Sequence, residues 1–131
     1  MKQEEIVSAI RETGGFESPQ QAESAVRATL KVLGERIAGG ETKDLAAQLP
    51  PAFAEALPPT GAGERFGLSE FYRRVAQEEG GECTEAEARR HARAVMAELK
   101  NAVTPPEFEQ VAGQLPTEYA ELLGREPVIH Y

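Results

Sequence analysis

The stretch Ala46-Ala47-Gln48-Leu49-Pro50 recurs, with one change, 66 positions later as Ala112-Gly113-Gln114-Leu115-Pro116. The same shift superimposes two sets of apolar residues at the three- and four-residue spacing that is typical of an amphipathic helix. The sequence therefore predicts a tandem duplication of one helical unit. The two sets are Ala22, Val26, Leu30, Leu33 and Ile37, and Ala88, Ala92, Met96, Leu99 and Val103.

Helix-start signals place the longest helix of each unit at about residues 19–37 and 85–103. Ser18 precedes the first and Thr84 the second, each with a Gln or Glu three residues later, which is the pattern of a capping box. A helix over about 3–13 comes before the first long helix, and its counterpart begins after Gly67. Two shorter helices should follow each long one, with Gly39-Gly40 and Pro105-Pro106 ending the long helices. The first of these shorter helices should carry Leu45 and Leu49 in unit one, and Phe108, Val111 and Leu115 in unit two.

We therefore expect an all-α fold in which two roughly four-helix units pack as one pseudo-symmetric domain. A single core is favoured because units this small usually stabilise themselves by burying a shared face. The expected divisions are unit one at about 1–57, a linker at 58–67, unit two at about 68–123 and a C-terminal tail at 124–131.

Composition argues against two classes of partner. The chain has 131 residues and a formal net charge of −8, and this negative charge repels nucleic-acid phosphates and anionic membrane surfaces. No apolar run approaches the roughly 18–20 residues that a transmembrane helix needs, and Met1 leads directly into an amphipathic segment, so a cytoplasmic location is expected. Cys83 is the only cysteine, which excludes an intrachain disulfide.

Three segments together resemble the bacterial domain-of-unknown-function family 2267. They are Asp44-Leu45-Ala46-Ala47-Gln48-Leu49-Pro50, Glu64-Arg65-Phe66-Gly67-Leu68-Ser69-Glu70-Phe71, and residues 88–99. The resemblance covers about residues 6–123 and implies an all-helical prokaryotic domain without an assigned activity, so it supplies no catalytic residues. The second unit departs from the first by carrying Gln110 where the first has Asp44.

Three uncharged residues are candidates for an interaction surface. Phe66 in the linker either anchors the connection in the core or presents a binding surface, and we favour the core. Gln48 and Gln114 either form two equivalent ligand pockets or satisfy backbone groups that the following proline exposes, and the second role is simpler.

Charged candidates lie on the second long helix. Glu87 and His91 share one helix face and offer two metal ligands, but two ligands do not make a strong site, so a solvated or half-buried histidine is expected. Arg89, Arg90 and Arg93 form a local positive concentration that can dock an acidic partner, although neighbouring glutamates offset it. We expect no metal site and no cofactor.

The tail ends in an apolar and aromatic cluster that includes Ile129 and Tyr131. It either serves as a docking peptide or folds over the protein's own core.

The sequence does not identify the function. The favoured hypothesis is a non-enzymatic protein-interaction module, with self-association as one form of that interaction. The alternative is a small-molecule binding protein or an unrecognised enzyme with a pocket between the repeats. Transcriptional regulation is disfavoured because no helix-turn-helix spacing is present.

Overall fold

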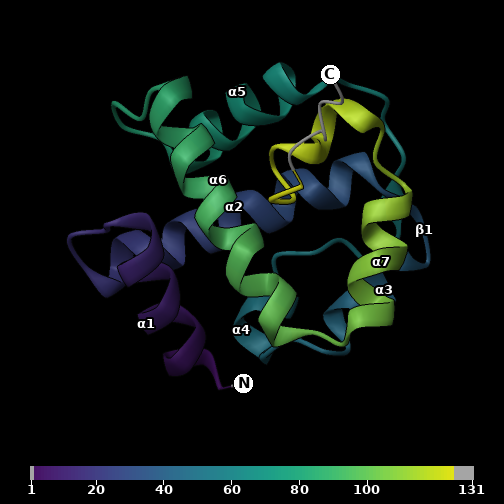
Figure 1. Ribbon diagram of the computed structural model, residues 1–131, viewed down its shortest axis with the longest axis horizontal. Coiled ribbons are helices and arrows are strands. Elements are labelled where there is room, and N and C mark those ends of the chain that lie inside the picture. The colour runs from purple at the N-terminus through teal and green to yellow at the C-terminus, as the bar shows by residue number, and fades with distance from the viewer. Residues whose placement is uncertain (1, 126–131) are drawn as a thin grey trace, which may run out of the picture.

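A computed structural model describes residues 2–125, which form a mostly helical fold (Figure 1). The expected sequence of helices is present in each half. In the first half these are α1 (Gln3–Gly14), α2 (Pro19–Arg36), α3 (Glu41–Ala46) and α4 (Pro51–Ala54). In the second half they are α5 (Leu68–Glu79), α6 (Glu85–Ala102), α7 (Pro105–Gly113) and the 3-10 helix η1 (Thr117–Ala120).

The two halves resemble each other in element lengths and in capping. Helices α1 and α5 have 12 residues each, and α2 and α6 have 18 each. The Ser18 side chain accepts a hydrogen bond from the Gln21 backbone N–H at 3.1 Å. Thr84 and Glu87 form a reciprocal capping box. These caps satisfy backbone donors that the first turn of a helix leaves open, and they explain why both long helices start where the sequence predicts.

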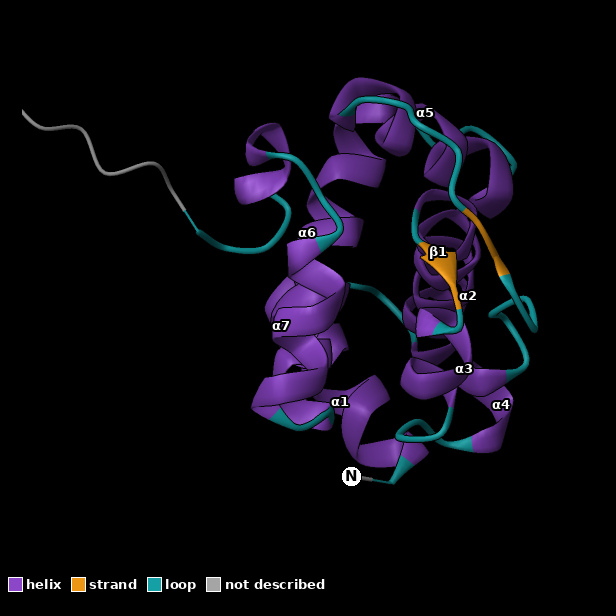
Figure 2. Ribbon diagram, turned by 90° about the vertical axis from the view of Figure 1, so that its right-hand side faces the viewer, coloured by secondary structure: helices purple, strands orange, loops and turns teal. Residues whose placement is uncertain are grey.

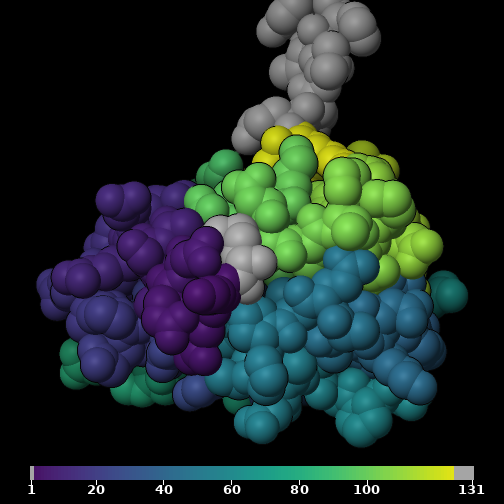
Figure 3. All heavy atoms as spheres, turned by 90° about the horizontal axis from the view of Figure 1, so that it is seen from below, coloured from purple at the N-terminus to yellow at the C-terminus, as the bar shows by residue number. Residues whose placement is uncertain are grey.

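The long helices α2 and α6 pack against each other at the centre, and α6 crosses in front of α2 in Figure 1. Helices α1 and α5 each contact both long helices, and α3 packs against α7. In Figure 2, α6 and α7 lie in one column and α2, α3 and α4 in the other. The space-filling view shows α1, the segment around α3 and α4, and the segment around α7 meeting on one face (Figure 3).

The buried apolar side chains form one cluster with members from both halves. Its largest fully buried side chains include Phe53 from the first half and Phe71 and Tyr119 from the second. No helix within residues 2–125 combines the length and apolar character that a bilayer crossing requires.

The structure corrects three details of the expected all-α fold. Strands β1 (Ala38–Gly39) and β2 (Gly61–Ala62) form a short antiparallel ladder, so part of the linker is paired. This pairing was not predicted because it depends on a close backbone approach: a Cβ at Gly61 would lie 2.2 Å from the Ile37 carbonyl oxygen.

The other two corrections concern helix ends. Pro105 and Pro106 do not simply end the second long helix, because they open α7, where their missing N–H groups cost nothing. Helices α3 and α7 end before Leu49 and Leu115, which pack just beyond them.

Candidate functional site

Gln48 and Gln114 each hydrogen-bond the backbone of the opposite half. The side-chain oxygen of Gln48 accepts from the Thr104 N–H at 2.8 Å, and that of Gln114 accepts from the Ala38 N–H at 2.7 Å. The two acceptors, Gln48 and Gln114, are 66 positions apart in the chain. The two donors, Ala38 and Thr104, are also 66 positions apart. The two amides therefore join the halves reciprocally.

Losing either glutamine is expected to weaken this junction. Gln48→Ala and Gln114→Ala should each lower the free energy of unfolding by about 1 kcal/mol, because each removes one hydrogen bond to a backbone N–H. Urea unfolding measures the change. Gln110→Ala is the matched control, because the side chain of this exposed glutamine on α7 forms no hydrogen bond within the described residues. Equal losses at all three positions would contradict the prediction.

Phe66 is part-buried and packs against the core. The Arg74 guanidinium lies 3.9 Å from the centre of its ring. Its carbonyl oxygen accepts hydrogen bonds from Arg36 Nε at 2.9 Å and from the Tyr119 hydroxyl at 2.6 Å. The ring and the carbonyl oxygen of Phe66 thus hold the linker against both halves, through Arg36 of the first and through Arg74 and Tyr119 of the second.

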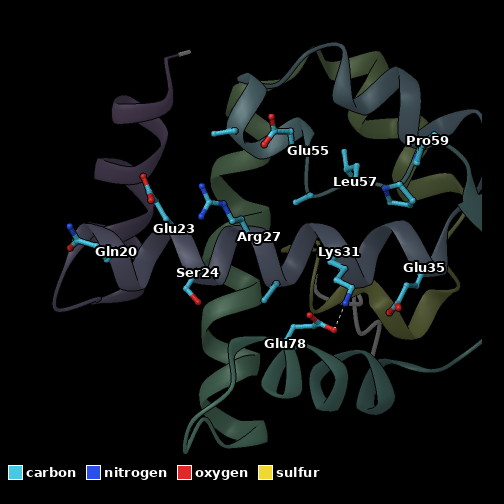
Figure 4. Close-up of a pocket in the computed structure, with 14 residues that line it drawn as sticks. Gln20, Glu23, Ser24, Arg27, Lys31, Glu35, Glu55, Leu57, Pro59 and Glu78 are labelled. Atoms are coloured by element: carbon cyan, nitrogen blue, oxygen red, sulfur yellow. Dashed lines mark hydrogen bonds and ion pairs between the residues drawn. The ribbon is translucent and has the colours of Figure 1, made fainter.

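An open groove of about 970 Å³ runs along α2, between α4 and α5 (Figure 4). Arg27 extends from α2 towards the α4 side, where Glu55 lies, and Lys31 extends towards α5, where it pairs with Glu78 at 2.6 Å. Within the described residues, the side chains of Arg27 and Glu55 form no hydrogen bond or ion pair. This groove, called the α2 groove, is lined by Gln20, Glu23, Ser24, Arg27, Ala28, Lys31, Glu35, Ala52, Glu55, Ala56, Leu57, Pro58, Pro59 and Glu78.

A second open groove of about 490 Å³ runs along α6 and brings Arg89 and Arg93 together with Arg90. Nine of its lining residues lie 66 positions after nine that line the α2 groove. The two grooves therefore occupy corresponding places in the two halves. This α6 groove is lined by Thr13, Ala86, Arg89, Arg90, Arg93, Ala94, Ala97, Glu121, Leu122 and Gly124.

The grooves differ in charge. Four acidic and two basic side chains line the α2 groove, whereas three arginines and one glutamate line the α6 groove. In the α6 groove, Arg89 Nε donates to Glu121 at 2.5 Å and the Tyr72 hydroxyl donates to the same carboxylate at 2.9 Å. The hydrogen bond from Arg89 is the main cause that lowers the pKa of Glu121 to about 2. The net charge of the lining side chains is thus negative in the α2 groove and positive in the α6 groove, although Arg27 and Arg93 occupy corresponding positions with the same sign.

His91 differs from the expectation, because it is buried, with 3% of its surface exposed. Its Nδ1 lies 2.9 Å from both carboxylate oxygens of Glu79, whereas Glu87 is used in the capping box. The ring also packs on Phe16, with centroids 4.6 Å apart. Glu79 was missed because it belongs to the preceding helix, and only the turn between α5 and α6 brings it to His91.

Cys83 lies next to this pair, with its sulfur 3.6 Å from a Glu79 oxygen. The donor atoms of Glu79, Cys83 and His91 all lie within 4.8 Å of one another, a set that can bind zinc once the thiol loses its proton. Burial is the main cause that raises the pKa of Cys83 to about 11, so the thiol is not poised as a nucleophile.

The predicted interaction residues thus fall in different places. Gln48 and Gln114 lie at the junction of the halves, Phe66 lies in the linker, and Arg89 and Arg93 line the α6 groove. The α2 groove was missed, although shifting the arginine positions back by 66 residues would have pointed to Glu23 and Arg27. Ile129 and Tyr131 lie outside the described residues.

A known protein family matches the chain. No curated protein matches the chain at a significant level. The sequence profile of the family described as "Uncharacterized conserved protein (DUF2267)" matches residues 3–122, nearly the whole chain. The protein therefore belongs to the DUF2267 family.

Proposed function

We propose that this DUF2267 protein is a non-enzymatic helical interaction module that associates with further copies of itself. The observation that carries the proposal is the pair of corresponding grooves with opposite charge. The side chains that line the α2 groove carry a net charge of −2, from four acids and two bases, and those of the α6 groove carry +2, from three bases and one acid. A surface with one sign attracts a surface with the other, which steers association and sets its register.

The proposed contact joins the α2 groove of one copy to the α6 groove of the next. Such a contact is heterologous, because each copy uses two different surfaces, and it generates rings or open chains of subunits. Exposed ion pairs contribute only about 0.2–1 kcal/mol each, so the association should be weak and should weaken further in high salt.

We also propose that the chain is a tandem duplication whose halves, at about residues 1–57 and 68–123, form one pseudo-symmetric domain. Support comes from the equal lengths of α1 and α5 and of α2 and α6, and from the reciprocal bonds of Gln48 and Gln114. A duplication also explains why one chain has two grooves that can diverge in charge.

Charge reversal in each groove tests the association. Glu55→Lys changes the α2 groove and Arg90→Glu changes the α6 groove, and both residues are exposed. Each variant alone should be monomeric in sedimentation velocity at a concentration where the unaltered protein self-associates. A mixture should form a one-to-one dimer, because the intact α6 groove of Glu55→Lys still faces the intact α2 groove of Arg90→Glu.

Glu4→Lys is the matched control, because it reverses an exposed carboxylate on α1 outside both grooves and should associate like the unaltered chain. A monomeric unaltered protein at high concentration and low salt, or a mixture that stays monomeric, overturns the proposal. Comparison with a chain ending at Gly124 separates a role of the tail from that of the grooves.

Small-molecule binding, or an unrecognised enzymatic activity, is the second candidate. An open pocket of about 440 Å³ at the junction of the halves favours it, lined in part by Arg36, Arg65 and Gln114. However, both ends of the Gln114 amide already contact the Ala38 backbone, because its oxygen accepts from the N–H at 2.7 Å and its nitrogen donates to the carbonyl at 3.5 Å, so a ligand would have to share or replace these bonds. A metabolite that co-purifies with the protein and is lost in Arg65→Ala would move this candidate ahead of self-association.

A further inference from the structure

Three carboxylates meet where the two halves join at α3 and α7, which lie side by side in Figure 1. Glu41 is the first residue of α3, and Glu107, 66 positions later, lies in the first turn of α7. Asp44 follows one turn after Glu41 on α3. One oxygen from each of the three carboxylates lies within 4.8 Å of the others. Negative charge is thus concentrated at one point of this junction.

The cluster is more than a set of exposed acids, because part of it is buried without a partner. Glu107 has only 6% of its surface exposed. Its Oε1 atom and the Oε1 atom of Glu41 are both buried, and neither has a hydrogen-bond donor within the described residues. A buried carboxylate oxygen without a donor is costly, so a cation bound between these oxygens would stabilise the arrangement.

The pKa of Glu107 reflects the same crowding of negative charge. Burial is the main cause that raises this pKa, to about 7, followed by the neighbouring Glu41 carboxylate and then by repulsion from Asp44. The two buried oxygens without a donor, which lie within one cluster of carboxylates, are the observation that points to a cation.

We propose that Glu41, Asp44 and Glu107 form a binding site for a calcium ion. The donor set contains only carboxylate oxygens, which suit a hard divalent cation and not zinc or copper. Magnesium demands near-ideal octahedral geometry, usually keeps several waters and is held by only one or two carboxylates, whereas calcium accepts more protein oxygens in a flexible geometry. Three converging carboxylates therefore favour calcium.

The site is open on one side, because Asp44 is exposed. Calcium takes six to eight oxygen ligands, so water fills the positions that the carboxylates leave free. The bound ion joins α3 of the first half to α7 of the second, close to the bond from Gln48 to the backbone of Thr104, the residue that caps α7. Calcium binding therefore strengthens the junction between the halves.

Isothermal titration calorimetry with calcium chloride, on the full chain after chelation at pH 8, tests the site. One calcium ion should bind per chain, with a dissociation constant of about 10⁻⁵–10⁻³ M. Glu107→Gln and Asp44→Asn should each weaken binding at least tenfold. Glu109→Gln is the matched control, because Glu109 lies on the same helix with an exposed side chain and should leave binding unchanged.

The variants remain informative because Glu107→Gln removes a buried charge and should fold, which a thermal melt verifies. Calcium should raise the melting temperature of the unaltered protein and of Glu109→Gln, but not that of Glu107→Gln. The proposal is overturned if the unaltered protein takes up no calcium, if all variants bind calcium equally, or if magnesium binds more tightly than calcium.

Discussion

Replacing Tyr119 by alanine is expected to lower the free energy of unfolding by about 3–5 kcal/mol, the largest effect that we predict for a single side chain. Tyr119 is fully buried and meets the Phe71 ring edge-on, with centroids 5.8 Å apart. Its hydroxyl donates to the Phe66 carbonyl at 2.6 Å. The substitution therefore creates a cavity and removes a hydrogen bond that holds the linker.

Urea unfolding followed by circular dichroism measures this loss. Tyr119→Phe is the graded control, because it keeps the ring and removes only the hydroxyl, and it should cost about 1–2 kcal/mol. The difference between the two variants separates the packing of the ring from its hydrogen bond. If both variants cost the same, the ring contributes nothing beyond its hydroxyl and the prediction is wrong.

The second large effect is a loss of stability as the pH rises from 5 to 8 in the absence of divalent cations. The pKa of Glu107 is raised to about 7 in the folded protein, above the ordinary glutamate value of 4.5 that we expect in the unfolded chain. The folded state therefore binds more protons between these two values. The contribution of the Glu107 proton to the free energy of unfolding is complete below about pH 4.5. It declines as the pH rises and is lost above about pH 7.

The decline should amount to about 2–3 kcal/mol between pH 5 and 8, because one pKa unit corresponds to about 1.4 kcal/mol. Urea unfolding at both pH values, with a chelator present, measures the decline. Glu107→Gln should abolish it, whereas Glu109→Gln should keep it. Glu121, whose pKa is lowered to about 2, titrates below this range and does not contribute. Parallel pH profiles for the unaltered protein and Glu107→Gln would refute the assignment.

Much of the helical pattern could be predicted because its signals are local. The cap at Thr84 needs only a side chain three residues away, and the apolar stripes need only helical spacing. The starts of α2 and α6 therefore agree with the sequence. The strand pairing of Gly39 with Gly61 escaped prediction because two-residue strands leave no periodicity to detect.

The candidate sites could be predicted only in part. Arg89 and Arg93 were identified because they are close in sequence, and they do line one groove. The correspondence between that groove and the α2 groove could be recognised only by applying the 66-residue shift to the lining residues that the structure shows. The contact of His91 with Glu79 depends on the turn between α5 and α6. The spacing of residues along a single helix, which suggested Glu87 as the neighbour of His91, carries no information about that turn.

The sequence by itself determined the family, the order of the helices and their starting points, because these depend on residues within a few positions of each other. Only the tertiary structure decided that Gln48 reaches Thr104, that Glu41 faces Glu107, and that the two grooves carry opposite charge. These features join residues far apart in the chain. Their distances are set by how α2, α3, α6 and α7 pack, and no local pattern records that packing.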